Sequence, residues 1–220
     1  MGHAENQDWL IIANGATLST KQLKSFQKSK KIIALDGAAL PCIREGIIPD
    51  IVLGDFDSLD RSLIDRLAKK YDIEFIYLPD QNSTDLEKSF YYILDYKPKS
   101  ISVCQATGLR LDHSIHNLRL LRRIHSQISD VTIYTEMEKV QFIRDKTIII
   151  SAEHNEPIAL LAFPEAIVTS KGLKFDMNNT LLKFAEREST SNHLVNGSAR
   201  IKIKGEILLI ISSGTELAVA

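Results

Sequence analysis

The first 137 residues alternate short apolar runs with segments of helical periodicity. The runs "WLIIA", "KIIAL", "DIVLG", "EFIYL", "SISVC" and "VTIYT" are each bounded by polar residues and predict six buried strands. Between several of them, the segments 62–71, 85–96 and 112–126 carry apolar residues three and four positions apart, which predicts amphipathic helices. Alternating strands and helices are typical of a parallel sheet that is covered by helices on both faces.

After about residue 137 the helical periodicity stops. The runs "QFI", "TIIIS", "IALLAF", "IVTS", "LLKFA", "ARIKIKG" and "EILLII" are short, strand-like and separated by Gly, Pro, Asn and Ser. This pattern predicts a small antiparallel sandwich or barrel. We therefore expect two domains, 1–137 and 138–220, packed together because no Pro/Gly-rich linker separates them.

Composition narrows the class of protein. The chain has 220 residues, of which 44% are hydrophobic and 25% charged, and a formal net charge of -1. No overall field would attract nucleic acid or an anionic membrane, and no apolar run is long enough to span a bilayer. The N-terminus lacks the apolar core of a signal peptide, and Cys42 and Cys104 have no C-x-x-C spacing, which favours buried thiols in a reducing compartment. We expect a cytoplasmic protein without a nucleic-acid or membrane partner.

Carboxylates follow the third strand in the stretch "VLGDFDSLD". In an extended segment side chains alternate, so Asp55 and Asp57 would converge on one side while Phe56 anchors in the core. Carboxylate oxygens in such a pair suit Mg²⁺, which keeps waters and accepts phosphate oxygens. Asp85, in "NSTD" at the start of the next helix, could add a third carboxylate and also belong to the N-cap of that helix. The alternative is that Asp55 or Asp57 caps a helix beginning near Leu59.

A second group follows the fifth strand in "TGLRLDH". Arg110 is the basic group among these strand-end aspartates, and its guanidinium could hold phosphate oxygens bidentately. Asp112 could cap the next helix or accept a proton from a substrate hydroxyl. His113 and His116 share a helix face, where we expect packing rather than metal binding. The turn "DGAA" at 36–39 would let a ligand approach a helix N-terminus, and any nucleotide must bind without a Walker loop.

Several of these motifs agree with one family. "LDGAA", "PDIVLGDFDSL", "DQNSTDLEKS" and "TGLRLDHSIHNL" resemble, in order and spacing, the catalytic domain of thiamine pyrophosphokinase. "TSKGLKFDMNNTLL" and "STSNHLVNGSARIKIKGEILLII" resemble its thiamine-binding domain. The resemblance implies an α/β fold with an N-terminal Rossmann-like parallel sheet, helices on both faces, and a smaller C-terminal antiparallel β-sandwich. Residues 1–137 would then be the catalytic ATP/Mg-binding domain and 138–220 the thiamine-binding domain.

The resemblance also implies a reaction and its residues. The family transfers pyrophosphate from ATP to the hydroxyl of thiamine, giving thiamine diphosphate and AMP, with Mg²⁺, as a homodimer that binds thiamine between its two domains at the subunit interface. Motif by motif, the metal-site positions are Asp55, Asp57 and Asp85; the nucleotide and phosphate positions are Asp36, Gln81, Thr84, Arg110 and Asp112; the thiamine positions are Phe175, Ser191 and Asn192. The chain departs from the family in having Leu109 where many members have a second glycine, Phe175 where members often carry Trp or Tyr, and no glycine before the "SN" pair.

Two other functions compete with this interpretation. An apolar run followed by D-x-D also opens the aspartyl-phosphate phosphatases, which makes a Mg-dependent phosphohydrolase the rival enzyme. Gly54 between strand and first Asp, and Leu59 two residues after the second, count against it. A non-catalytic thiamine- or nucleotide-binding regulatory module is the rival outside enzymes, and it has no need of three strand-end carboxylates and an arginine.

Overall fold

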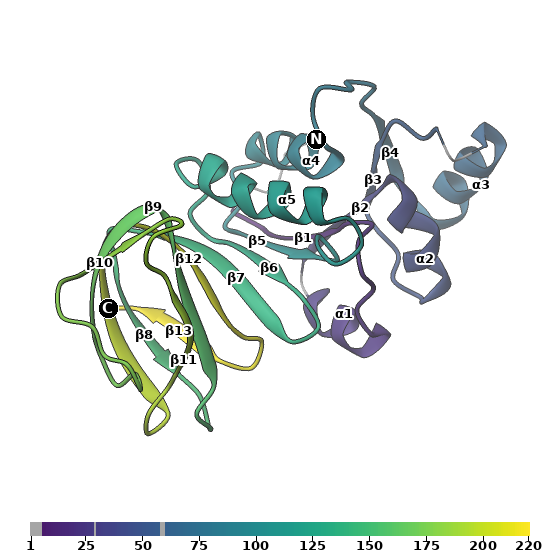
Figure 1. Ribbon diagram of the computed structural model, residues 1–220. Coiled ribbons are helices and arrows are strands. Elements are labelled where there is room, and N and C mark those ends of the chain that lie inside the picture. Colours follow the sequence, from purple (N-terminus) through teal and green to yellow (C-terminus); the bar gives the residue numbers. More distant parts are fainter. Residues whose placement is uncertain (1–5, 29, 58–59) are drawn as a thin grey trace. The chain divides into compact units, whose positions relative to one another are not determined.

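The structure is a computed structural model that describes residues 6–28, 30–57 and 60–220. The chain divides into two compact units, Met1–Glu136 and Met137–Ala220. The first contains parallel strands and helices, and the second contains antiparallel strands (Figure 1). In the described part of the chain, no helix combines the length and apolarity that a membrane crossing requires.

All six predicted strands of the first unit are present. They are β1 (Asp8–Ile12), β2 (Lys31–Leu35), β3 (Ile51–Gly54), β4 (Glu74–Tyr77), β5 (Ser100–Cys104) and β6 (Val131–Tyr134). They pair in the order β6-β5-β1-β2-β3-β4, and every pair is parallel. The predicted α/β fold is thus confirmed, and the strand order reverses at β1.

Helices connect these strands and cover both faces of the sheet. They are α1 (Thr20–Phe26), a 3-10 turn η1 (Asp36–Ala38) that leads into α2 (Ala39–Arg44), α3 (Arg61–Tyr71), α4 (Asp85–Leu94) and α5 (Leu111–Ile124). Figure 1 shows α4 and α5 over one face of the sheet and α1 over the other. On β1, Leu10 and Ile12 belong to the core cluster with Leu23 of α1, while Trp9 and Ile11 are buried as well. Because both faces are covered, the strand residues form continuous apolar runs.

The start of α3 tests whether Asp55 or Asp57 caps this helix. Asp60 is the N-cap residue, and its carboxylate accepts a hydrogen bond from the backbone N–H of Ser62 at 3.4 Å. The alternative that Asp55 or Asp57 caps this helix is therefore wrong, since a cap must lie directly before the first turn. The expected helix start near Leu59 falls outside the described residues.

The second unit is an antiparallel β-structure around its own core. Its strands are β7 (Glu138–Arg144), β8 (Thr147–Ser151), β9 (Pro157–Lys171), β10 (Thr180–Lys183), β11 (Ser189–His193), β12 (Ser198–Ser212) and β13 (Glu216–Val219). The long strand β12 pairs with β7, β8 and β9, and β9 also pairs with β10 and β11. Their inward-facing residues, among them Leu160, Val168 and Ile201, form one buried cluster.

Two pairs of predicted strands are single strands in the structure. "IALLAF" and "IVTS" both lie in β9, and "ARIKIKG" and "EILLII" both lie in β12. The breakers Pro164 and Gly205 mark an irregularity, because the register between β9 and β12 shifts between Gly205 and Ile207. Gly205 has φ +104, and an added Cβ would lie 2.5 Å from the carbonyl oxygen of Glu165. A glycine at such a close backbone approach bends a strand without ending it.

Candidate active site

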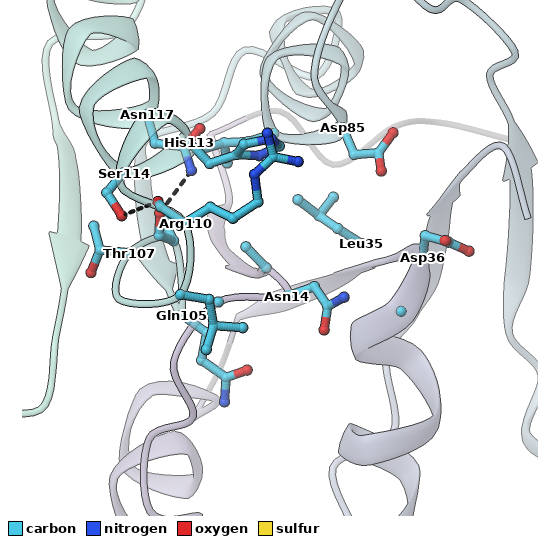
Figure 2. A pocket seen from close by; sticks show the side chains of 16 residues that line it. Asn14, Leu35, Asp36, Asp85, Gln105, Thr107, Arg110, His113, Ser114 and Asn117 are labelled. Atoms are coloured by element: carbon cyan, nitrogen blue, oxygen red, sulfur yellow. Dashed lines mark hydrogen bonds between the residues drawn. The ribbon is translucent and has the colours of Figure 1, made fainter. Parts of the chain in front are cut away.

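A pocket lies at the carboxyl end of the parallel sheet, where the strand order reverses. The end of β1 there adjoins those of β2 and β5, the position at which open α/β sheets bind ligands. The pocket has a volume of about 410 Å³. Residues that follow strands or open helices line it: Asn14 and Gly15 after β1, Asp36 and Gly37 after β2, Gln105, Thr107 and Arg110 after β5, Asp85 of α4, and His113, Ser114 and Asn117 of α5. Figure 2 shows Arg110 on one side of the pocket and Asp36 and Asp85 on the other.

Glycines let the strand ends approach one another beneath this pocket. A Cβ on Gly15 would lie 2.3 Å from the carbonyl oxygen of Gln105 and 2.6 Å from that of Thr107. Gly108 has φ +103, and its Cβ would lie 2.4 Å from the Cβ of Ala16. A side chain at either position would push the loops after β1 and β5 apart. These glycines therefore allow the backbone itself to form the pocket floor.

The loop that carries Arg110 is fixed to helix α5 by two side chains. The Ser114 hydroxyl donates to the backbone oxygen of Arg110 at 2.8 Å and accepts from the N–H of Gly108 at 3.1 Å. The amide of Asn117 donates to the backbone oxygen of Ala106 at 2.7 Å (Figure 2). Hydrogen bonds from a helix to both ends of the loop hold residues 106–110 in one conformation.

Arg110 is paired with Asp112 on the same side of the pocket. Its Nε and Nη2 donate to the two carboxylate oxygens at 3.1 and 2.5 Å. The hydrogen bond from Arg110 lowers the pKa of Asp112 to about 2, so this carboxylate is a poor proton acceptor at neutral pH. Of the two roles left open for Asp112, the helix cap is wrong, because the N-cap residue is Arg110 and Asp112 lies in the first turn. The guanidinium is oriented by this pair.

The geometry of the Asp55 segment differs from the expected alternation. Phe56 has φ +54, so residues 55–57 are not extended, and Asp55 Oδ1 accepts from the N–H of Asp57 at 3.4 Å. The reasoning that alternation alone aligns both carboxylates is therefore wrong. Phe56 nevertheless packs against the core, with its ring centroid 5.7 Å from that of Phe75. Gln81 donates to Asp55 Oδ2 at 3.1 Å, and this hydrogen bond lowers the pKa of Asp55.

The start of α4 brings Asp85 next to a buried lysine. Thr84 is the N-cap residue and accepts from the N–H of Glu87 at 3.3 Å. Asp85 follows it and lines the pocket. Lys88, only 8% exposed, donates to Asp85 Oδ1 at 3.2 Å and to the backbone oxygen of Leu78 at 3.0 Å. Lys88 thereby ties the loop after β4 to the first turn of α4.

The described carboxylates at these strand ends do not form a cluster of metal ligands. Across residues 6–28, 30–57 and 60–220, no three His, Cys, Asp or Glu side chains are grouped so that they could hold a metal ion. The predicted metal positions offer only carboxylate oxygens, which are the donors that Mg²⁺ prefers. The carboxylate oxygens therefore suit Mg²⁺, but the structure does not bring Asp55, Asp57 and Asp85 together as one group.

The second unit holds the residues expected to contact thiamine. Phe175 lies in the turn between β9 and β10, and its side chain is 61% exposed. Ser191 and Asn192 lie on β11, where Ser191 is exposed with φ +55 and Asn192 is buried. The amide of Asn192 hydrogen-bonds to both the N–H and the carbonyl oxygen of Phe175, each at 3.0 Å. The structure thus brings Asn192 and Phe175 together within this unit.

Two family models match the chain. The model described as "Thiamin pyrophosphokinase, catalytic domain" matches residues 23–134, and "Thiamin pyrophosphokinase, vitamin B1 binding domain" matches residues 146–208. The chain belongs to the thiamine pyrophosphokinase family. Thiamin pyrophosphokinase 1 of Caenorhabditis elegans is 28% identical over 208 residues, covering 88% of this chain and 84% of that protein. Thiamine pyrophosphokinase of Bacillus subtilis is 26% identical over 207 residues, covering 92% and 97%.

Solved structures of the family share this fold. Thiamine pyrophosphokinase from Bacillus subtilis superposes with a TM-score of 0.82 at 23% identity, covering 94% of this chain and 99% of that one. Thiamin pyrophosphokinase from Candida albicans superposes with a TM-score of 0.80 at 20% identity, covering 96% and 90%. At these identities the structural likeness establishes the fold.

The pocket collects some of the predicted residues of this family member and adds others. Asp36, Asp85 and Arg110 line it, whereas Asp55, Asp57, Gln81, Thr84 and Asp112 lie outside its lining. Sequence reasoning did not assign Asn14, Gln105, Ser114, Asn117 or Lys88. Gln105 follows β5 directly and Asn14 follows β1 after Ala13, so both lie where the strand-end rule directs attention, although neither was given a role. Nothing in the local pattern around Lys88 indicates that a charged residue would be buried there.

Proposed function

We propose that this chain transfers the pyrophosphoryl group of ATP to the hydroxyl of thiamine, giving thiamine diphosphate and AMP. The observation that carries the proposal is the pocket at the reversal of strand order, with Arg110 on one side and Asp36 and Asp85 on the other, in a chain that both domain models of the family match. In the reaction the thiamine hydroxyl oxygen bonds to the β-phosphorus of ATP, the bond from that phosphorus to the α-phosphate oxygen breaks, and AMP leaves.

We assign the pocket at the end of the parallel sheet to ATP. We assign the phosphates to Arg110, because a guanidinium can bind two phosphate oxygens at once and Asp112 already fixes its orientation. Asp36, at the end of β2, faces the same pocket, and Thr84 and Gln81 fix the segment from which Asp85 enters it. Arg110 thereby also stabilises negative charge that develops on the phosphates during transfer.

Mg²⁺ is the metal that we assign to Asp55, Asp57 and Asp85. Gln81 orients Asp55, and the lowered pKa of Asp55 keeps that carboxylate ionised. Asp85 is engaged by Lys88, so we place it as a metal ligand only when its side chain turns from that lysine. When bound, Mg²⁺ would neutralise phosphate charge and help to orient the reacting groups.

We assign the side chains that bind thiamine to the second unit. Phe175 presents an exposed aromatic ring, which suits the flat aminopyrimidine and the cationic thiazolium of thiamine. Ser191 directly precedes Asn192 on β11, and its side chain is exposed. We propose that Phe175 and Ser191 contact thiamine and that Asn192, which hydrogen-bonds to the Phe175 backbone, belongs to the same site.

We further propose a cytoplasmic homodimer. Ile167 of β9 and Leu181 of β10 are direct cross-strand neighbours, and both are more than 40% exposed. Apolar side chains that share an exposed sheet face are better covered by another protein surface than by water. Cys42 and Cys104 are free and buried, which is consistent with a reducing compartment. Light scattering at micromolar concentration tests the assembly, and a fully active monomer would contradict it.

One incubation separates the proposal from both rivals. The protein is mixed with ATP and Mg²⁺, with and without thiamine, and AMP, ADP and phosphate are quantified. Pyrophosphate transfer predicts AMP formation that depends on thiamine. A phosphohydrolase would release phosphate without thiamine, and a regulatory module would bind ligand without turnover.

A further inference from the structure

Strand β11 contains a bulge that turns Asn192 into the protein. Ser189 pairs with Leu160 of β9, whereas Asn192 pairs with Ile158, so β11 has one more residue than β9 between these points. Ser191, within the bulge, has φ +55. A bulge of this kind reverses the face to which the following side chain points. Asn192 is consequently only 2% exposed.

The buried side-chain amide of Asn192 forms two hydrogen bonds with the backbone of Phe175. Its Oδ1 accepts from the Phe175 N–H at 3.0 Å, and its Nδ2 donates to the Phe175 carbonyl at 3.0 Å. Oδ1 also accepts from the N–H of His193 at 3.0 Å, and Nδ2 donates to the Ser189 hydroxyl at 3.4 Å. Both lone pairs and both hydrogens of the amide are therefore used within the protein. No hydrogen-bonding capacity remains for a ligand.

The turn that carries Phe175 is also held from its other side. The Asp176 carboxylate accepts from the Ser170 hydroxyl at 2.9 Å and from the N–H groups of Gly172 and Leu173 at 3.2 and 3.0 Å. Between these two anchors the Phe175 ring is 61% exposed. An aromatic ring on a fixed backbone is preorganised to stack on a flat or cationic ligand.

We propose that Asn192 is a positioning residue that controls thiamine affinity through Phe175 and does not touch thiamine. The inference rests on the proposed function, because it takes Phe175 as the aromatic contact of thiamine. It replaces the direct contact that the family resemblance implies for Asn192 and leaves that of Ser191 unchanged. Replacing Asn192 removes both side-chain partners of the Phe175 backbone, so the ring is no longer held in the orientation that binds thiamine.

A double-mutant cycle tests this positioning role. Thiamine KM, ATP KM and kcat are measured for the wild type, Asn192→Ala, Phe175→Ala and the double variant. Each single change should raise thiamine KM about tenfold, the effect of losing one aromatic contact to a cation, and leave ATP KM within about twofold. Because both changes remove the same contact, the double variant should also show about a tenfold increase, where independent effects would multiply to about a hundredfold.

Matched variants separate positioning from general damage to the unit. Asn178→Ala changes an exposed asparagine of the same turn and should leave thiamine KM unchanged. Asn192→Asp keeps an acceptor for the Phe175 N–H but loses the donor to the Phe175 carbonyl, so its thiamine KM should also rise above that of the wild type. It replaces Asn192→Ala in the cycle should the alanine variant not fold.

Each outcome of the cycle has a definite meaning. Multiplicative effects of the two single changes in an active enzyme would overturn the positioning role alone. A fall in kcat and melting temperature without a change in thiamine KM would reduce Asn192 to a structural residue and overturn it too. If the wild type forms no AMP in response to thiamine, the proposed function fails, and this inference fails with it.

Discussion

Arg110→Lys should strongly impair transfer while leaving the protein folded. In the structure Asp112 engages Nε and Nη2 of the guanidinium, which leaves three of its five N–H donors outside this pair; we assign these to phosphate oxygens. A lysine ammonium at this position has one nitrogen, which must serve Asp112 and phosphate together. The bidentate hydrogen bonding to phosphate is therefore lost although the positive charge remains.

The size of the effect follows from the donors that are lost. Removing a donor to charge that develops in a transition state typically costs about a hundredfold to a thousandfold in kcat. Because Lys keeps the charge, we expect a decrease of about a hundredfold. The Arg110 side chain is 69% exposed, so the melting temperature should change by no more than about 2 °C.

The assay is steady-state AMP formation at saturating thiamine and varied ATP, at constant ionic strength. Arg119→Lys, at an exposed position of the same helix, is the matched control and should behave as the wild type. A kcat for Arg110→Lys within about threefold of the wild type would refute the assignment of the phosphates to Arg110.

Three further predictions follow from the site. Asp55→Asn should lower kcat at least about a hundredfold at ordinary Mg²⁺ without unfolding, while Asp65→Asn on α3 should not; near-normal turnover of the first variant counts against the metal assignment. Gly15→Ala, whose Cβ would lie 2.3 Å from a carbonyl oxygen, should destabilise the protein by about 1–3 kcal/mol in chemical denaturation. Gly214→Ala, whose Cβ would have nothing within 4 Å, should leave stability unchanged. Equal stability of the two variants would show that the strand ends can separate. Arg110 lowers the pKa of Asp112 to about 2, from an ordinary value of 3.8. Their pair therefore favours the folded state above about pH 4, and this contribution is lost as the pH falls toward 2. An NMR titration of the Asp112 carboxyl with a midpoint near 4 would exclude a persistent pair.

The parallel sheet could be predicted because burial on both faces leaves a simple pattern. "KIIAL" has the same limits as β2, Lys31–Leu35, and "SISVC" the same as β5, Ser100–Cys104. The pattern missed β11, whose residues "STSNH" are all polar, because its place in the sheet depends on pairing with β9 and on a bulge. Neither feature has a local hydrophobic signature.

The candidate site was only partly visible in the sequence. The strand-end rule identified Asp36, Asp85 and Arg110, which the structure brings to one pocket. It could not foresee the left-handed backbone at Phe56, because an extended segment and a turn can have the same composition. The burial of Lys88 depends on the carbonyl of Leu78, ten residues earlier in the loop after β4. Contacts of this kind arise from tertiary packing and not from local periodicity.

The central claim is that the β- and γ-phosphates of ATP move together to thiamine. It is tested most directly with ATP labelled in the β-phosphate, incubated with the protein, Mg²⁺ and thiamine, followed by separation of the products. We predict that the label appears in thiamine diphosphate, in an amount equal to the AMP formed, and that none appears in inorganic phosphate. Label that stays in ADP beside thiamine monophosphate, or that is released as phosphate without thiamine, would contradict pyrophosphate transfer.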